Sequence, residues 1–545
     1  MRFRRPRSWM QWARRVSQIL FLVLFLALAL RVRISENNVP GADATFFFKL
    51  DPLVSLSTAI AARSLSVIFV PAVIILAATV LFGRFFCGWI CPLGAIHAAA
   101  SWFRAKRPAA APAERRTVWH RAKYAVLVAL LVMALFGAHW TGIFDPIPLL
   151  FRSTAVFLFP AAQYAVEDSS LAVLQADPHV GPAHLKMLTE PVYKFGRSTL
   201  FLVDRQTYTG AAFIAGLFIL IVALNLVRPR FWCRYVCPLG GLLGFASLRP
   251  ALRLKNEEKR CTGCGLCAKA CPAAAQPDRP GEWLPTECYG CWNCVASCRR
   301  GALAFNVENP MAPAAADSVD FSRRAALGAS AAGVAAMLGF RQHPTAQGRV
   351  FAAELVRPPG SLTEREFLQR CQQCGACMRA CPTNALQPCA LEAGVEGLWT
   401  PRINAKVGYC EYNCNLCGQV CPTGAIQPLT MEKKKEVKIG LACFDKDRCL
   451  PYAFGRECMV CEEHCPTPQK SIYFVPREVE LRDGQKLTVK QPQVDPDKCT
   501  GCGICEWCCV FRDTAAVHIT SANETRHSNN QPILPGGGGG GSSPY

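Results

Sequence analysis

The sequence lacks several features that mark soluble enzymes and haem proteins. It contains no Cys-x-x-Cys-His motif, which excludes covalently attached c-type haem. Only nine of the 545 residues are histidine, and no pair of them suits a b-type haem between apolar segments. Charged residues make up only 18% of the chain, and no nucleophile or acid–base constellation is present. These absences argue against a soluble enzyme that performs chemistry on a bound substrate.

Apolar residues and cysteine are abundant instead. Hydrophobic residues make up 51% of the chain, and the 31 cysteines are too many for an ordinary enzyme, in a chain too long for a small disulfide scaffold. The net charge of +21 would suit nucleic acid, but much of it flanks apolar runs, so we expect no nucleic acid partner. At roughly 150 residues per domain, three or four domains are expected. The composition predicts a protein that contacts membrane lipid and is rich in metal-binding thiols.

Five apolar runs predict helices, at residues 16–32, 64–82, 124–143, 209–227 and 325–340. A helix needs about 20 residues to cross the hydrocarbon, so the first and last runs are short, and any single run could instead be a buried core helix. Basic residues crowd 2–15 and 104–123, whereas the loops at 33–63 and 144–208 mix both charges. By the positive-inside rule, we expect a bacterial inner-membrane protein whose N-terminus and residues 228–322 are cytoplasmic.

The fifth run has an unusual beginning. Arg323 and Arg324 precede a short segment rich in alanine and glycine, a pattern that resembles a twin-arginine export signal. The alternative is an ordinary positively charged start to a membrane anchor. Both interpretations place the residues after about 345 in the periplasm.

The predicted membrane part contains an internal repeat. The pattern Arg-Phe-aromatic-Cys-x3-Cys-Pro-Leu-Gly occurs at residues 84–94 and 230–240, and an Asp-Pro pair precedes each copy. Spacing of four residues places each cysteine pair on one side of a helical turn. Two sequence readings stay open: a shared ligand set for a metal or cluster, or reduced structural thiols. The four thiols belong to Cys87, Cys91, Cys233 and Cys237.

Six cysteine quartets follow the repeat. Two lie in the predicted cytoplasmic segment: Cys261, Cys264, Cys267, Cys271 and Cys288, Cys291, Cys294, Cys298. Four lie in the predicted periplasmic segment: Cys371, Cys374, Cys377, Cys381; Cys410, Cys414, Cys417, Cys421; Cys449, Cys458, Cys461, Cys465; and Cys499, Cys502, Cys505, Cys509. Three thiols at two-residue intervals wrap one [4Fe–4S] cube, and the fourth reaches a second cube. The quartets should therefore work in pairs and exchange their last members, which predicts six [4Fe–4S] clusters.

The pairing assigns each last cysteine to its partner quartet. Cys298 and Cys271 should be exchanged in the first pair, Cys421 and Cys381 in the second, and Cys509 and Cys465 in the third. The spacings Cys410-x3-Cys414 and Cys449-x8-Cys458 depart from the standard loop, and Cys508 could replace Cys509. Zinc sites usually use two distant Cys-x2-Cys pairs, which does not fit six such runs. Disulfides would suit a periplasm, but twin-arginine export delivers proteins already folded, with clusters inserted.

These observations predict a membrane all-α fold: two repeated hairpins form a four-helix domain, a fifth helix is a signal anchor, and small α+β ferredoxin-like modules lie on both sides. The predicted boundaries are 1–250 for the membrane domain, 251–310 for a cytoplasmic two-cluster module, 311–345 for the linker and anchor, 346–522 for a periplasmic four-cluster module, and 523–545 for a flexible tail.

The chain resembles a pair of known proteins. Residues 1–310 resemble the NapH-type membrane subunit of the periplasmic nitrate reductase system, with four helices and two Cys-x3-Cys-Pro motifs. Residues 318–522 resemble its NapG-type partner. The resemblance rests on the segment Gly408–Cys417 and on the interval of eight residues between Cys449 and Cys458. Methylamine-utilisation ferredoxins and NosR-type membrane proteins share much of the pattern. Here the two subunits look fused.

This resemblance implies oxidation of quinol from the quinone pool, with electrons passing through the clusters to a periplasmic c-type cytochrome or reductase. Asp51 and Asp145 could accept protons from a quinol, but Asp before Pro also opens a helix as its N-cap, and we favour that role. Two other functions stay open: a maturation or regulatory redox protein for a metalloenzyme, and an electron-transfer subunit of a larger respiratory complex.

Overall fold

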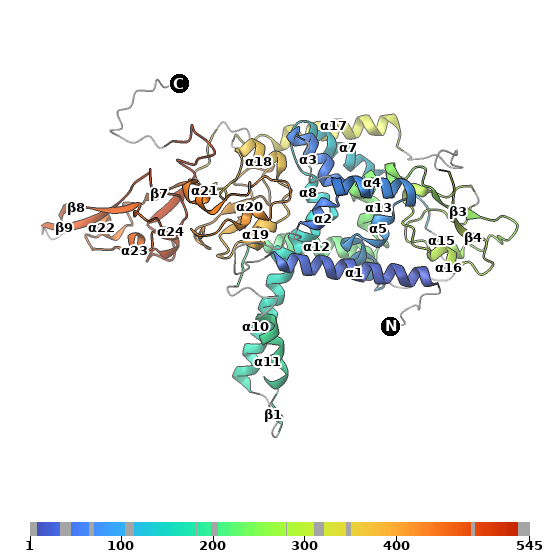
Figure 1. Ribbon diagram of the computed structural model, residues 1–545, viewed down its shortest axis with the longest axis horizontal. Coiled ribbons are helices and arrows are strands. Elements are labelled where there is room, and N and C mark those ends of the chain that lie inside the picture. The colour runs from blue at the N-terminus through green and yellow to red at the C-terminus, as the bar shows by residue number, and fades with distance from the viewer. Residues whose placement is uncertain are drawn as a thin grey trace.

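The chain forms a layer of helices between two cysteine-rich modules at opposite ends of a long axis, as the computed structural model shows (Figure 1). The structure describes residues 8–32, 45–64, 70–103, 114–177, 179–180, 183–184, 186–197, 205–279, 281–309, 321–344, 350–480 and 486–531. The basic residues at 2–7 and 104–107 and most of the predicted tail lie outside these ranges.

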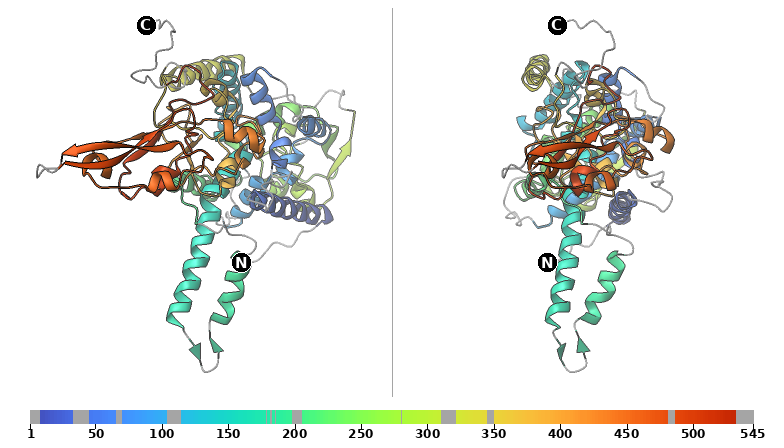
Figure 2. Two further views of the ribbon diagram at one scale, coloured as in Figure 1. Left: turned by 60° about the vertical axis from the view of Figure 1, so that its left-hand side comes forward. Right: turned by 90° about the vertical axis from the view of Figure 1, so that its left-hand side faces the viewer.

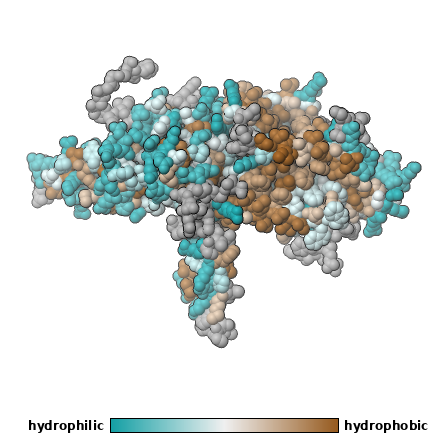
Figure 3. Space-filling view, viewed as in Figure 1, coloured by the Kyte–Doolittle hydropathy of each residue, from teal (hydrophilic) through white to brown (hydrophobic). Residues whose placement is uncertain are grey.

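A helix forms within each of the five apolar runs. These helices are α1 (Trp9–Arg31), α4 (Val70–Phe82), α7 (Ala122–Leu135), α12 (Ala211–Ala223) and α17 (Arg323–Phe340). Among the described residues, three helices are long and apolar enough to cross a membrane, namely Trp9–Arg31, Val118–Leu135 and Pro146–Ala176. Apolar side chains cover the surface of the helix layer, and hydrophilic surface covers both ends (Figure 3).

Residues 146–176 and 186–195 form helices where the sequence analysis expected a loop at 144–208. After α8 (Thr141–Phe144), α9 (Pro146–Ser153), a π-helical turn η3 (Thr154–Leu158) and α10 (Phe159–Ala176) run without a break. The short strands β1 (His179–Val180) and β2 (Ala183–His184) then lead to α11 (Lys186–Phe195). Together α10 and α11 project away from the long axis as a hairpin (Figures 1 and 2). The mixed charge of this segment hid its helical character.

Both copies of the repeat fold alike. In the first, α3 (Pro52–Ala62) and α4 lead to α5 (Phe85–Trp89) and α6 (Pro92–Ala100); in the second, α9 and α12 lead to α13 (Phe231–Tyr235) and α14 (Pro238–Ala246). The second cysteine of each copy is an N-cap, because Pro follows it and its Sγ accepts a hydrogen bond three residues on: Gly94 N–H to Cys91 at 3.4 Å and Gly240 N–H to Cys237 at 3.3 Å. The short elements α2 (Phe46–Lys49), η2 (Val118–Arg121) and η5 (Leu224–Leu226) complete the layer.

The N-terminal cysteine-rich module pairs β3 (Leu252–Asn256) with β4 (Leu303–Val307) in an antiparallel ladder. Two one-turn helices, α15 (Leu266–Ala270) and α16 (Asn293–Ser297), lie between these strands in sequence, with the 3-10 turn η6 (Pro285–Glu287). This is the small α+β arrangement that the sequence predicts for residues 251–310.

The C-terminal module repeats this arrangement twice. Its first half has α18 (Glu364–Arg370), α19 (Ala376–Ala380), α20 (Leu416–Gln419), α21 (Met431–Glu436) and the ladder β5 (Leu386–Pro388) with β6 (Pro401–Ile403). Its second half has α22 (Leu450–Ala453), α23 (Val460–Glu463), α24 (Ile504–Cys508), the ladder β7 (Leu441–Phe444) with β10 (Val517–Thr520), and the hairpin β8 (Ile472–Glu480) with β9 (Lys486–Val494).

The start of the predicted tail is ordered and belongs to the C-terminal module. The Thr525 N–H donates to the carbonyl of Lys438 at 2.9 Å, and the Arg526 guanidinium donates to Glu364 at 2.9 Å. The module boundary at 522 is therefore too early, because residues 523–531 pack against it.

Both modules dock firmly on the helix layer. The Trp89 indole N–H donates to the carbonyl of Gly290 at 3.0 Å on the N-terminal side. On the other side, Gln372 Nε2 donates to Thr58 Oγ1 at 2.9 Å, and Arg152 donates to the carbonyl of Gln373 at 3.0 Å. One apolar core contains residues of the layer and of both modules. The modules and the layer therefore form one packed body.

Candidate iron–sulfur centres

A left-handed residue after the second cysteine lets the backbone turn sharply into a one-turn helix. Gly265, Gly375 and Gly503 adopt φ of +67°, +79° and +82° and immediately precede α15, α19 and α24. Glycine tolerates this conformation because it has no Cβ. In the second quartet Trp292 takes the same place at +53°. The turn gathers three nearby thiols on one side.

The fourth thiol of each site comes from the partner quartet. One cavity, with about 310 Å³ of atom-free space, is lined by Cys288, Cys291, Cys294 and the exchanged Cys271. Its other walls include Leu254, Trp283 and Phe305, so water has little access. This is the exchange that the spacing predicts.

Two further cavities in the C-terminal module show the same exchange. Cys499, Cys502 and Cys505 line one with Cys465, and Cys449, Cys458 and Cys461 line the other with Cys509. Their atom-free spaces are about 340 and 360 Å³. Cys509, and not its neighbour Cys508, lies on the second cavity wall.

Most thiols of the other three predicted clusters interact electrostatically with the thiols of their own set. Cys377 interacts with Cys371, Cys374 and the exchanged Cys421. Cys417 interacts in the same way with Cys410, Cys414 and the exchanged Cys381. In the outermost N-terminal set, Cys267 interacts with Cys264. Cys267 and Cys298 also pack on one small core. Cys261 belongs to this set by its spacing alone.

These sites fit a cluster and not a single ion. Within the described residues, no three His, Cys, Asp or Glu side chains lie close enough to share one metal ion. The thiols surround a volume instead, as the ligands of a [4Fe–4S] cube do. Burial raises the pKa of Cys374 and of Cys288 to about 12, so without a cluster these thiols would be neutral.

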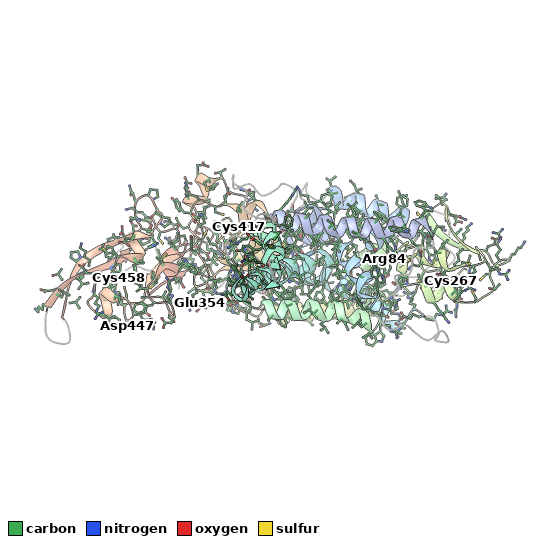
Figure 4. All side chains as sticks on the ribbon, turned by 90° about the horizontal axis from the view of Figure 1, so that it is seen from below. Arg84, Cys267, Glu354, Cys417, Asp447 and Cys458 are labelled. Carbon is green, nitrogen blue, oxygen red and sulfur yellow. The ribbon has the colours of Figure 1, made fainter. Side chains whose placement is uncertain are left out.

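The C-terminal quartets form a continuous series. Cys377 interacts with Cys417, the Cys410 N–H donates to the carbonyl of Cys502 at 2.8 Å, and Cys505 interacts with Cys461. The series therefore begins at the helix layer, where Gly375 lies against Arg152, and ends at the quartet of Cys458. Cys267, Arg84, Cys417 and Cys458 follow one another along the long axis (Figure 4).

The four thiols of the repeat converge inside the helix layer. All are buried, and Cys87 interacts electrostatically with Cys91 and Cys237, as does Cys233. Arg84 and Arg230, the first residues of the two motifs, are also buried. Sequence reasoning missed these arginines, although their repetition was a visible signal. That these thiols hold a metal ion or a cluster stays a prediction.

Two carboxyl groups lie beside these thiols. Asp51 Oδ1 accepts from the N–H of Leu53 at 2.9 Å, and Asp145 Oδ1 accepts from that of Ile147 at 3.0 Å, so both are the N-caps expected from the sequence. Both side chains are fully buried, and the two carboxyl groups interact electrostatically with each other. Asp145 interacts with Cys87. Sequence reasoning did not foresee that the two caps meet.

Two of the nine histidines, His97 and His139, are buried inside the helix layer. His97 Nδ1 lies 2.6 Å from the Asn225 amide, and His139 Nε2 lies 3.0 Å from Ser57 Oγ. Each is held by polar neighbours inside the layer.

Comparison with known families agrees with this geometry. A 4Fe-4S binding domain matches residues 65–109, 210–255 and 417–437, and so includes both copies of the repeat. Two 4Fe-4S dicluster domains match residues 253–299 and 285–385. The fold and the sites define an iron–sulfur electron-transfer protein.

Relatives narrow this class to one family. The chain is 36% identical over 199 residues to the methylamine utilization ferredoxin-type protein MauM of Methylorubrum extorquens, which is 36% of this chain and 87% of that protein. It is 35% identical over 193 residues to the ferredoxin-type protein NapG of Escherichia coli, which is 35% of this chain and 79% of NapG. A 112-residue stretch, 20% of this chain, is 34% identical to YccM of the same organism and spans 31% of it. No solved structure matches the chain. The chain belongs to the ferredoxin-type family of MauM and NapG.

Proposed function

We propose that this protein is a quinol dehydrogenase of the bacterial inner membrane. It oxidises quinol in the helix layer and passes the electrons through iron–sulfur clusters to a periplasmic c-type cytochrome or reductase. In this proposal a NapH-like membrane part and a NapG-like polyferredoxin share one chain. The N-terminal module faces the cytoplasm and the C-terminal module faces the periplasm.

One observation carries the proposal: cysteine thiols lie at both ends of the apolar layer and also inside it. Tyr289 lines the cavity of Cys288 and interacts electrostatically with Cys233 of the layer. Cys87 interacts with Asp145, and on the far side Cys374 interacts with Arg152. Bound clusters would supply one-electron transfer along this path. The protein holds them, excludes water and fixes their spacing.

The two buried carboxyl groups supply a place for protons. Two buried carboxyl groups that interact with each other resist double ionisation, because like charges at close range repel. Asp51 and Asp145 are such a pair, and they lie beside the thiols of the repeat. We infer that this pair takes up protons that quinol releases on oxidation, in addition to capping α3 and α9.

Electrons would leave from the end farthest from the layer. The cavity of Cys449, Cys458, Cys461 and Cys509 lies in the last quartet of the series. Phe454 and Met459 are exposed close to Cys458 in sequence, which suits transient contact with an acceptor protein.

The test is anaerobic reduction of the purified, detergent-solubilised protein by added quinol. The proposal predicts loss of the visible absorbance of the clusters without any other protein. A Glu366→Gln variant, changed on the exposed side of α18, serves as the control and should behave like the wild type. Reduction only after a partner enzyme is added would contradict the proposal. It would favour a maturation factor or a subunit whose quinone site lies in another chain.

A further inference from the structure

The repeat brings four thiols together inside the helix layer, close to the N-terminal module and outside every quartet. Cys87, Cys91, Cys233 and Cys237 are 8%, 7%, 7% and 5% exposed. Cys91 interacts with Cys87 and Cys233, and Cys237 interacts with the same two thiols. Two of the four thiols come from each repeat.

Each repeat sends an arginine across to the other. Arg230 donates to the carbonyls of Cys87 at 3.0 Å and Gly94 at 3.2 Å, both in the first repeat. Arg84 reaches the second repeat: its Nη2 lies 2.6 Å from where a Cβ on Gly240 would stand. The site therefore has two buried guanidinium groups beside four thiols.

Arg84 carries hydrogen-bond donors that no protein group satisfies. It is fully buried, and its Nη1 donates to the Thr286 carbonyl at 3.0 Å and lies 3.4 Å from Glu287. Its Nε and Nη2 have no partner among the described residues. A buried charged donor without an acceptor costs several kcal/mol. An anionic group held by the neighbouring thiols would provide that acceptor.

We propose that Cys87, Cys91, Cys233 and Cys237 bind a seventh iron–sulfur cluster. The 4Fe-4S binding domain matches residues 65–109 and 210–255, and each of these segments contains only two cysteines. Neither segment can complete a cluster alone, because four thiolates are required. Arg84 and Arg230 would balance the negative charge of a cluster with four thiolate ligands.

The position of the seventh cluster suggests a role as an electron relay. That role, unlike the cluster itself, rests on the proposed function. The guanidiniums of Arg84 and Arg230 lie 5.1 and 4.8 Å from the ring centre of Tyr289, which lines the cavity of Cys288. Gly88 is in close contact with the Tyr289 carbonyl. The seventh cluster would thus adjoin the N-terminal module and occupy the gap inside the layer.

Iron and acid-labile sulfide are measured per chain on anaerobically purified protein. Seven cubes give about 28 irons, and six give about 24. The double variant Cys87→Ala/Cys233→Ala should lose about four irons, or about two if the cluster is a [2Fe–2S] rhomb. The control Cys389→Ala/Cys443→Ala removes one buried and one exposed thiol outside every quartet and should keep the full content. Equal iron in wild type and the first variant would overturn the proposal.

A second variant covers the case in which the double substitution disrupts folding. Arg230→Gln removes a positive charge beside the thiols but no ligand and no salt bridge of the described residues, so the iron content should stay complete while the reduction potential of one paramagnetic signal falls. If every paramagnetic signal of the variant kept the reduction potential that it has in the wild type, the proposal would be overturned. These readouts need no quinol, so failure of quinol reduction would contradict the proposed function and leave the seventh cluster standing.

Discussion

At the scale of single residues, buried ion clusters join parts of the chain that are far apart in sequence. Glu287 of the N-terminal module contacts Lys123 and Arg84 of the helix layer. In the C-terminal module, Glu364 accepts from Arg357 at 2.6 Å and from Arg526 at 2.9 Å. Breaking a buried pair by removing one partner is costly, because an uncompensated charge remains. These buried groups of charged residues hold distant segments of the chain together.

Replacing Glu364 by Gln should destabilise the C-terminal module by about 3–5 kcal/mol at neutral pH. Burial opposes ionisation of this carboxyl, but Arg357 and Arg526 outweigh it and hold its pKa at about 2, below the ordinary 4.5. Its contribution is therefore complete above pH 4.5 and disappears as the pH falls from 4.5 to about 2.

Thermal unfolding, followed by the visible absorbance of the clusters, measures this effect. The difference between wild type and Glu364→Gln should be largest near neutral pH and narrow below pH 4.5. Glu366→Gln on the same helix is the matched control, since Glu366 bonds only to Thr363 among the contacts described for it. A difference in thermal midpoint between the two proteins that does not change with pH would contradict this stabilising role of Glu364.

The cluster-binding cysteines could be predicted from the sequence, because the spacing of ligands within one quartet is local. The known chemistry of two-cluster ferredoxins then predicted which cysteines the quartets exchange. The buried charged residues that pair with one another could not be predicted in this way. In the sequence Lys123 is one of the basic residues that flank an apolar run and Arg84 is the first residue of the repeat, and only the packed structure shows both fully buried around Glu287. The meeting of Asp51 and Asp145 likewise depends on how the two repeats pack.

At the scale of helices, α17 packs along α7 through a small residue. A Cβ on Gly333 would lie 2.7 Å from the carbonyl oxygen of Ala129, which is too close for any side chain. Gly328 on the same helix has no heavy atom within 4 Å of its Cβ position. The twin-arginine-like segment is thus a packed helix of the layer, with Ser322 as its N-cap.

The substitution Gly333→Val should force α17 away from α7 and lower the thermal midpoint by several degrees, a loss on the order of 1–3 kcal/mol. Gly328→Val places the same residue in open space and should change the midpoint little. The thermal midpoints of both variants are measured on detergent-solubilised protein at the same heating rate. Equal shifts in the two variants would show that α17 does not depend on this contact.

The helices were predictable in part. Each apolar run contains one, because a continuous hydrophobic stretch is a local signal. The segment that forms α9 and α10 was expected to be a loop, since its acids and bases lie among apolar residues. Asp145 followed by Pro146 did mark its first residue, as the N-cap that the sequence suggested.

At the scale of the whole molecule, two cysteine-rich modules lie at opposite ends of an apolar layer (Figures 1 and 3). A reporter fused after Gln531, beyond the packed residues 523–531, should be periplasmic, and one placed after Asn309, beyond β4, should be cytoplasmic. Replacing Arg323 and Arg324 by Lys should keep the C-terminal module inside the cell if a twin-arginine route exports it. Unchanged export would identify α17 as a plain membrane anchor.

The central claim is that the chain carries electrons from one end of the layer to the other. Its most direct test uses sealed vesicles in which residues 251–310 face outward, and a reductant that cannot cross the bilayer. Paramagnetic resonance then follows the C-terminal clusters, with Cys87→Ala/Cys233→Ala as the interrupted control. The account predicts that the enclosed C-terminal clusters become reduced in the wild type and stay oxidised in the variant. Reduction confined to the two outward-facing clusters of the wild type would contradict it.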